Sequence, residues 1–205
     1  MSHGILFIVS APSGAGKTSL LAALLEADAE LTVSTSHTTR PPRPREVAGV
    51  DYHFIDATTF EQMVAADAFI EHAEVFGNRY GTSRESVSAA LAGGSDVVLE
   101  IDWQGAALVR QVLPNAVSIF IVPPSQQALR QRLLERAQDD PDVIEARLAA
   151  ARSEMQHHGE FDYLVINDHF HTALMELKAI VTAERCREDR RAAKNRALLD
   201  ALLAG

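Results

Sequence analysis

The sequence predicts an α/β fold, in which a parallel sheet is flanked by helices and carries an inserted small α+β lobe and a short lid. Three observations predict it. Short, mainly apolar segments alternate with segments of helical periodicity along most of the 205 residues. A glycine-rich segment joins the first apolar segment to the first helical one. A proline-containing stretch of weaker periodicity, from about 35 to 93, interrupts the alternation.

The apolar segments are expected to be neighbouring strands of one sheet. They are Ile5–Val9, Asp96–Ile101, Ala116–Val122 and Tyr163–Ile166. Strands that are apolar on both faces are typical of a parallel sheet covered by helices on both sides. The helices expected to cover it are Lys17–Glu26, Trp103–Val112, Ser125–Ala137, Val143–His157 and Thr172–Arg187.

Two interruptions divide the chain into three expected parts: a core (1–34, 94–123 and 158–205), an inserted lobe (35–93) and a lid region (124–157). Three prolines between His37 and Glu46 exclude regular structure there. Short alternating segments follow at Asp51–Ile55 and Phe69–Phe76, and Gly77-Asn78 predicts a turn. The segment Arg136–Asp142 separates two helices and predicts a short mobile flap.

Composition and charge narrow the class of protein. The net charge of −9 argues against a general nucleic-acid binder. No apolar run has the length of a membrane span, Met1–Gly4 lacks the pattern of a signal peptide, and the single Cys186 cannot form an intrachain disulfide. We therefore expect a cytoplasmic protein without nucleic-acid or membrane partners. Arg185–Arg196 is expected to be a solvated helix face, and His157-His158 a helix surface rather than a metal site.

The segment after the first strand, SAPSGAGKT at Ser10–Thr18, predicts a phosphate-binding P-loop. Its glycines let the backbone wrap a phosphate, and the helix N-terminus behind them attracts anions. Lys17 is expected to reach the outer phosphates of ATP, and the Thr18 hydroxyl to be a ligand of Mg²⁺. The expected ATP-binding residues are Ala11, Pro12, Ser13, Gly14, Ala15, Gly16, Lys17 and Thr18. Ala11 replaces the first glycine of the strict motif, which restricts the backbone but removes no phosphate contact.

Two carboxylates, Glu100 and Asp102, end the second apolar strand. Their spacing predicts that both lie on one face, at the carboxyl end where ligands bind to parallel sheets. Either could contact Mg²⁺ through water or orient Lys17. The P-loop predicts a triphosphate donor, but alone it does not separate a kinase from a GTPase or a motor ATPase, and the two carboxylates help to separate them.

Further motifs follow one another along nearly the whole chain: Ser36–Glu46, Gly49–Tyr52, Phe69–His72, Gly77–Ser83, Glu100–Gly105 and Asn167-Asp168. With the P-loop, they make the sequence resemble bacterial-type guanylate kinases, which are P-loop nucleoside monophosphate kinases. The resemblance implies Mg²⁺-dependent phosphoryl transfer from ATP to GMP, giving ADP and GDP, and hence GMP recycling and guanine nucleotide supply. It leaves a homo-oligomer open.

The resemblance also implies roles for individual residues. The GMP phosphate would be held by Arg40, Arg43, Tyr52 and Tyr80, braced by Glu46. The guanine would be read by Ser36, Glu71 and Asp102, with Thr82 and Glu100 nearby. The transferred phosphoryl group would meet the lid arginines Arg132, Arg136 and Arg147, which with Lys17 and Arg40 form the expected catalytic set. Asn167 would lie near the adenine of ATP.

The chemistry of these residue types supports the assignment. A carboxylate such as Glu71 accepts from guanine N1–H and N2–H together, whereas adenine would leave it unpaired. Buried groups that lose their partner in this way discriminate by about 10⁴-fold or more. A serine hydroxyl suits guanine O6, and guanidinium groups bind phosphate oxygens in pairs.

Two alternatives come from other classes. A non-catalytic interaction module of the same fold would bind phosphorylated partners, and a P-loop kinase for a sugar phosphate would share the loop. The first would not need Gly16-Lys17-Thr18, and the second would not need Ser36, Glu71 and Asp102 together. Besides Ala11, this sequence departs from the family pattern at Arg45 and Ala137, which replace glycines, and at Glu100, which replaces an aspartate.

Overall fold

The computed structural model describes residues 4–44, 46–75, 77–136 and 141–204, apart from the side chains of 136, 141 and 142. Its centre is a five-stranded sheet in the order β2-β7-β1-β8-β9, with every neighbouring pair parallel. The strands are β1 (Leu6–Ser10), β2 (Leu31–Val33), β7 (Asp96–Glu100), β8 (Val117–Val122) and β9 (Tyr163–Ile166). The predicted parallel sheet is confirmed, and the short edge strand β2 is added to it.

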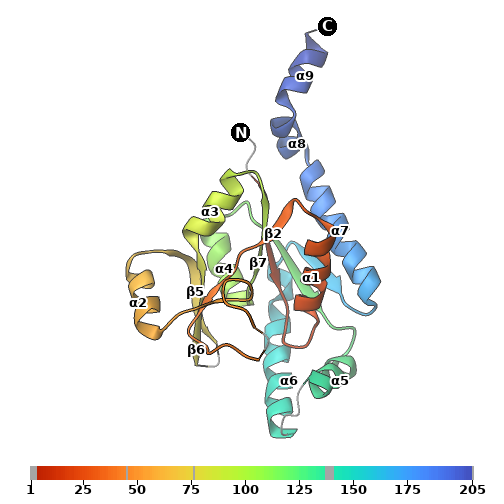
Figure 1. Cartoon of the computed structure of the whole chain (residues 1–205). Helices are drawn as coiled ribbons and strands as arrows, with labels where there is room; N and C mark the ends of the chain where they lie inside the picture. Colours follow the sequence, from red (N-terminus) through yellow and green to blue (C-terminus); the bar gives the residue numbers. More distant parts are fainter. Residues whose placement is uncertain (1–3, 45, 76, 137–140, 205) are drawn as a thin grey trace.

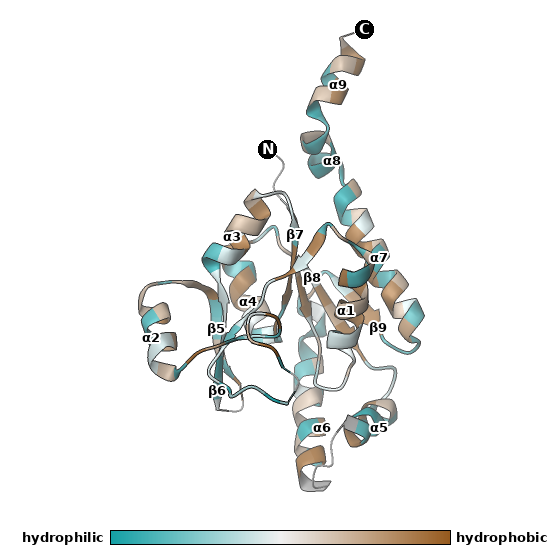
Figure 2. Cartoon of the chain, viewed as in Figure 1, coloured by the Kyte–Doolittle hydropathy of each residue, from teal (hydrophilic) through white to brown (hydrophobic). Residues whose placement is uncertain are grey.

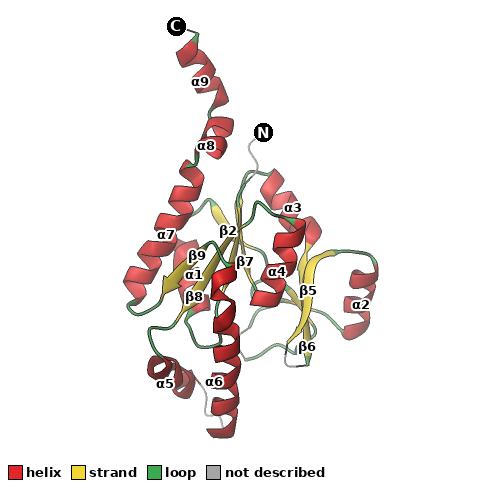
Figure 3. Cartoon of the chain, turned by 180° about the vertical axis from the view of Figure 1, so that it is seen from behind, coloured by secondary structure: helices red, strands yellow, loops and turns green. Residues whose placement is uncertain are grey.

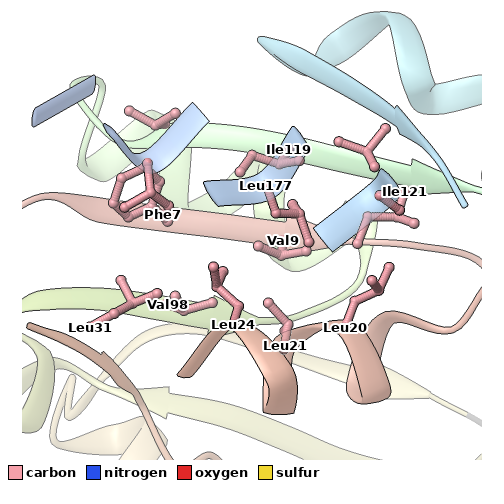
Figure 4. Close-up of a cluster of buried hydrophobic side chains, with 14 of the residues drawn as sticks. Phe7, Val9, Leu20, Leu21, Leu24, Leu31, Val98, Ile119, Ile121 and Leu177 are labelled. Atoms are coloured by element: carbon pink, nitrogen blue, oxygen red, sulfur yellow. The ribbon is translucent and has the colours of Figure 1, made fainter. Parts of the chain in front are cut away.

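Helices cover both faces of this sheet, as predicted (Figure 1). They are α1 (Lys17–Ala27) and α7 (Phe170–Cys186) on one face, with α3 (Arg84–Ala92) and α4 (Trp103–Val112) on the other. Phe7 and Val9 of β1 face Leu24 of α1 and Leu177 of α7 (Figure 4). Because alternate residues of a strand point to opposite faces, a doubly covered strand must be apolar throughout. The central strands are accordingly the brown, hydrophobic segments of Figure 2.

A second, four-stranded sheet stands beside the first, in the order β4-β3-β6-β5. Its strands are β3 (His37–Thr38), β4 (His53–Phe54), β5 (Phe69–Val75) and β6 (Asn78–Ser83), and helix α2 (Ala57–Ala65) lies between β4 and β5 in the sequence. The exclusion of regular structure from His37 onward is wrong for the first two residues, because the prolines begin only at Pro41 and leave β3 free to pair with β6. Strand β6 and helices α2 and α3 were not predicted, since their apolar periodicity is weak and only Phe60 and Val87 are buried within the two helices.

The lid region contains two helices packed on each other, α5 (Gln126–Arg136) and α6 (Pro141–Met155), followed by the 3₁₀ helix η1 (Gln156–Glu160). Leu129 and Leu133 of α5 pack against Ile144, Leu148 and Ala151 of α6. The predicted helices are confirmed to within two residues at their ends. The predicted flap falls largely on 137–140, outside the described residues, as do the departures at Arg45 and Ala137.

The C-terminal residues form α8 (Glu188–Lys194) and α9 (Arg196–Leu203), which extend away from both sheets (Figures 1 and 3). The expectation of a solvated basic face is wrong for Arg185 at the end of α7. Its guanidinium donates to Asp28 Oδ2 at 2.7 Å and to Asp96 Oδ2 at 2.6 Å. Arg190 likewise pairs with the buried Glu184. Within the described ranges, none of the helices is both long and apolar enough to cross a membrane.

Arg185 connects three distant segments, because Asp96 also accepts from the backbone N–H of Ile5 at 2.7 Å. Replacing Arg185 by methionine would keep the aliphatic contacts and leave Asp96, which is only 6% exposed, without its charged partner. We expect the free energy of unfolding to fall by about 2 kcal/mol or more. Urea unfolding measures this change. The matched control is Arg187→Met, which removes an exposed pair with Asp189 and should cost under about 0.5 kcal/mol; equal losses would contradict the role of Arg185.

Candidate active site

The predicted phosphate-binding loop lies between β1 and α1, with both of its glycines in the left-handed region (φ 88° at Gly14 and 91° at Gly16). A side chain at Gly16 would collide with the Asn167 amide, and one at Gly14 would lie 3.0 Å from Leu129 and Leu133. Both positions therefore favour glycine for conformation, and Gly16 requires it for space as well. Ala11 does not have a positive φ, so its backbone does not need a glycine, and its side chain packs against the core.

Asn167 and Arg132 stabilise the loop through hydrogen bonds to backbone carbonyls. The Asn167 Nδ2 donates to the Ala15 carbonyl at 2.7 Å and is buried. Arg132 of α5 donates to the Asn167 carbonyl at 2.8 Å. The structure thus brings both predicted residues to the loop, one from the end of β9 and one from the lid region.

The side chains of Lys17 and Thr18 point back to the end of β7. Lys17 Nζ donates to the Ile101 carbonyl at 3.2 Å, and Thr18 Oγ1 donates to Glu100 Oε1 at 2.7 Å. Asp102 caps α4, since its Oδ1 accepts from Gly105 N–H at 2.8 Å. Glu100 and Asp102 line the same cavity, which confirms the prediction that they share a face. However, β7 ends at Glu100, so Asp102 is placed by its role as the N-cap of α4 and not by strand periodicity.

That cavity, which we call the base cavity, lies between the two sheets. It is lined by Lys17, Ser36, Tyr52, Glu71, Ala73, Val75, Tyr80, Glu100, Ile101 and Asp102. The predicted Ser36, Glu71 and Asp102 come from different elements and meet here. A carboxylate pair and a hydroxyl on the walls of one cavity offer acceptors and a donor to a polar ring.

Glu71 of β5 is 5% exposed and accepts from Thr82 Oγ1 at 2.6 Å. Gly105 leaves the space it needs, because a side chain there would lie 2.8 Å from Glu71 Oε2. Burial raises the pKa of Glu71 from 4.5 to about 7; the Thr82 hydrogen bond opposes this shift and the charge of Asp102 adds to it. The buried carboxylate accepts from Thr82 and has the capacity to accept further hydrogen bonds, so it is suited to a ligand that supplies donors.

A cluster of charged and aromatic side chains lies in the lobe beside the base cavity. Arg40 Nη2 donates to both oxygens of Glu46, at 2.8 and 3.0 Å, and the Arg43 backbone N–H donates to Glu46 Oε2 at 2.7 Å. The guanidinium of Arg40 lies 5.5 Å from the centre of the Tyr52 ring, which meets Tyr80 edge-on at 5.9 Å. The bond to Glu46 is the main cause that raises the pKa of Arg40. Glu46 thus orients Arg40 and the backbone of Arg43.

A larger cavity of about 900 Å³, the phosphate cavity, connects the loop to the lobe. Ser13 and Thr18 line it from the loop, Arg43 and Glu46 from the lobe, and Arg147 from α6. It shares Ser36, Tyr52 and Glu100 with the base cavity. Positive groups from two parts of the chain, Arg43 of the lobe and Arg147 of α6, therefore face the phosphate-binding loop across one space. The side chain of Arg136 lies outside the described part of the chain.

Two features of this region were not predicted. His157 stacks on Trp103 with ring centres 3.4 Å apart and an angle of 8°, and its Nδ1 lies 2.6 Å from Glu160 Oε1. His157 lies in η1 and its side chain is 26% exposed, so its predicted place on a helix surface holds, but its stacking partner was not predicted. His158 is exposed. Glu154 of α6 lies near Lys17 and Asp102. The spacing of Glu154 and His157 predicts a shared helix face, but not which segment that face meets.

Comparisons with known proteins identify the family. A guanylate kinase family model matches residues 4–184. The chain is 57% identical over 187 residues to a guanylate kinase of Alkalilimnicola ehrlichii, covering 91% of this chain and 92% of that protein. It is 54% identical to an Escherichia coli K12 guanylate kinase over 206 residues, the full length of both. The crystal structure of a guanylate kinase from Anaplasma phagocytophilum covers 93% of this chain and 90% of its own, with a TM-score of 0.78 and 34% identity. The chain belongs to the guanylate kinase family.

Proposed function

We propose that the protein transfers the γ-phosphoryl group of ATP to GMP, giving ADP and GDP, and so recycles GMP and supplies guanine nucleotides. The observation that carries the proposal is the buried Glu71 carboxylate, which faces the same cavity as Lys17 of the phosphate-binding loop. Glu71 would select the base of the phosphoryl acceptor and Lys17 would hold the phosphates of the phosphoryl donor, so one cavity would bring the two substrates together.

Guanine suits the base cavity because of its hydrogen-bond pattern. Guanine N1–H and N2–H would donate to the Glu71 carboxylate, which a hydrogen bond from Thr82 already holds in place. Ser36 would donate to O6, and Asp102 would accept from the remaining N–H. Adenine presents an acceptor at N1 and would leave the buried carboxylate unpaired, which is costly. This difference is the proposed basis for choosing GMP over AMP.

The GMP phosphate would lie against Arg40, Arg43, Tyr52 and Tyr80. Arg40 is already oriented by Glu46, so little side-chain freedom is lost when phosphate binds. The second pKa of a phosphate monoester is about 6, so the attacking oxygen is mostly ionised at neutral pH and needs no general base.

Transfer would then depend on positioning and on neutralising charge. An oxygen of GMP bonds to the γ-phosphorus, the bond from that phosphorus to the β–γ bridging oxygen breaks, and ADP leaves with the electron pair. Lys17 and the lid arginines Arg132, Arg136 and Arg147 would neutralise the phosphoryl oxygens. Asn167, which packs under the loop at Ala15, would lie on the adenine side.

Thr18 and Glu100 fit a magnesium ion carried with ATP, because their oxygens meet at 2.7 Å beside the loop and Mg²⁺ prefers oxygen ligands. Thr18 would hold the ion directly and Glu100 or Asp102 through water. When bound, Mg²⁺ would supply positive charge to the β- and γ-phosphates.

Closure of the lobe (35–93) and the lid region (124–157) over the core would exclude water from ATP. This division into parts is itself proposed, and it is supported by the separate second sheet and the α5–α6 pair. We also propose a cytoplasmic location without nucleic-acid or membrane partners, which the net charge of −9 and the composition support.

A panel of nucleoside monophosphates tests the function. Purified protein with Mg-ATP should phosphorylate GMP at least about 10⁴-fold more efficiently, in kcat/KM, than AMP, CMP or UMP. Equal rates with all four would overturn the guanine-reading role of the base cavity. GMP binding without turnover would instead indicate the non-catalytic module.

The KM for GMP should depend on pH through Glu71. GMP pairs with the ionised carboxylate, whose pKa in the empty protein is about 7. Between pH 8 and pH 6 we expect KM to rise about tenfold as this group takes up a proton. In Glu71→Gln the rise should be smaller and follow only the phosphate pKa of GMP, near about 6. Initial rates across this range measure the effect, and identical profiles for both proteins would contradict it.

A further inference from the structure

The segment that follows α6 is anchored on α4 by two stacked rings. His157 of η1 lies on Trp103 with the ring centres 3.4 Å apart and an angle of 8° between the ring planes. Trp103 is the first residue of α4. Figure 3 shows α6 with its C-terminal end reaching the central sheet near α4. The stack therefore lies at the proposed boundary between the lid region and the core.

A second contact holds the same segment further along α4. The Arg110 guanidinium donates to the Glu160 backbone carbonyl, and its Nη2 lies 3.3 Å from Glu160 Oε2. The guanidinium also lies 5.0 Å from the centre of the Phe161 ring. Residues seven apart share one face of a helix, so Trp103 and Arg110 present a common face to η1. The anchor thus extends over about two turns of α4.

Glu160 links these two contacts. Its Oε1 lies 2.6 Å from His157 Nδ1, and because a carboxylate only accepts, this nitrogen carries the hydrogen. Arg110 meets the other oxygen of the same carboxylate. The imidazole is therefore held at its edge by Glu160 and on its face by the indole of Trp103. Two restraints on one ring give the stack a defined geometry.

The two helices that the stack joins carry different parts of the candidate active site. Asp102, which lines the base cavity, caps α4 immediately before Trp103. Arg147, which lines the phosphate cavity, lies on α6. Helix α4 is packed on the central sheet through Ala106 and Val109, whereas the buried apolar residues described for α6 form a cluster with α5. The stack therefore ties the lid helix to a helix that the core already holds.

We infer that Trp103 and His157 are positioning residues, whose stack fixes the direction of α6 and so places Arg147 across the phosphate cavity from the phosphate-binding loop. Backbone hydrogen bonds make an α-helix stiff, so an anchor at its C-terminal end controls where a side chain within it lies. A displacement of about 1 Å at a reacting group can lower a rate substantially. The inference rests on the proposed kinase function, because it assigns a role within that site.

The fluorescence of Trp103 tests the stack itself, because the chain has no other tryptophan. His157→Ala uncovers one face of the indole to water, so the emission should shift to longer wavelength. His157→Phe keeps a flat ring over the indole and should shift the emission less. Identical emission spectra from the unmodified protein and His157→Ala would overturn the stack and the inference with it.

Steady-state kinetics of the same variants in the full chain test the role of the stack. In His157→Ala we expect kcat to fall about tenfold, because Arg147 is no longer held in place. The KM for GMP should change less than about twofold, since most residues proposed to contact GMP belong to the lobe. His157→Phe should recover most of the lost kcat, because it restores the stacking ring.

His158→Ala is the matched control, because His158 is the next residue of η1 and its side chain is exposed. Its kcat and its emission should equal those of the unmodified protein. Equal kcat values in the alanine and phenylalanine variants of His157 would overturn the inference while leaving the proposed function intact. So would a melting temperature that falls and a KM for GMP that rises together with the loss of kcat, since these changes indicate a purely structural role. An unmodified chain that does not phosphorylate GMP would overturn both.

Discussion

Replacing Glu71 by glutamine is expected to lower kcat/KM for GMP about 10²-fold or more and to reduce the preference for GMP over AMP. The amide keeps the size of the side chain and an acceptor for Thr82. It replaces the second carboxylate oxygen by an N–H₂ group, which opposes the guanine donors and can donate to adenine N1. The kcat/KM values for GMP and for AMP, each measured with Mg-ATP, give the preference as their ratio.

Glu74→Gln is the control for this substitution, because Glu74 lies on the same strand and is exposed. It should leave the ratio unchanged. If the Glu71 and Glu74 variants kept the same preference for GMP, Glu71 would have no part in reading the base, and recognition would fall to Ser36 and Asp102.

The same substitution should make the empty protein more stable at high pH. The pKa of Glu71 is higher in the folded protein, about 7, than its ordinary value of 4.5, so the folded state binds the proton more tightly. The free energy of unfolding therefore falls as pH rises from about 4.5 to 7, by roughly 2 to 3 kcal/mol. Glutamine does not titrate, so the free energy of unfolding of the variant does not fall in this way. Urea unfolding at pH 8 should therefore show the variant to be the more stable protein. Recognition of GMP would thus come at the expense of stability.

Replacing Lys17 by alanine is expected to reduce kcat about 10³-fold or more, with the fold intact. Lys17 is the only lysine of the loop, and its ammonium is aimed at the end of β7, where the two cavities meet at Glu100. Its loss removes positive charge from the phosphoryl group during transfer. Single-turnover rates measure the change, and circular dichroism checks the fold.

Lys194→Ala serves as the control, because Lys194 makes only an exposed ion pair with Glu30 at 3.8 Å among the interactions described for it. It should leave kcat unchanged. Turnover that survives in Lys17→Ala would contradict the role of the loop in catalysis, and it would favour a different donor site.

The local features of the fold could be predicted because their causes are local. A strand buried on both faces must be apolar throughout, which identified β1, β7 and β8. The edge strand β9 was identified by the same apolar pattern, although its Leu164 and Ile166 are exposed. The two loop glycines were predicted to let the backbone wrap a phosphate, and the structure shows both in the left-handed region that favours glycine. The lobe was harder: β3 is only two residues long and is defined by pairing with β6, about 40 residues away.

The sequence by itself determined the parallel sheet, the phosphate-binding loop and the set of residues that resemble guanylate kinases. Tertiary structure alone decided how those residues meet. Thr18 and Glu100 are 82 positions apart, and they bond because β1 and β7 are neighbours. Glu71 needs the space left by Gly105 on another element, because a side chain there would lie 2.8 Å from Glu71 Oε2. Desolvation and hydrogen bonding depend on what surrounds a side chain, and no local pattern specifies those surroundings.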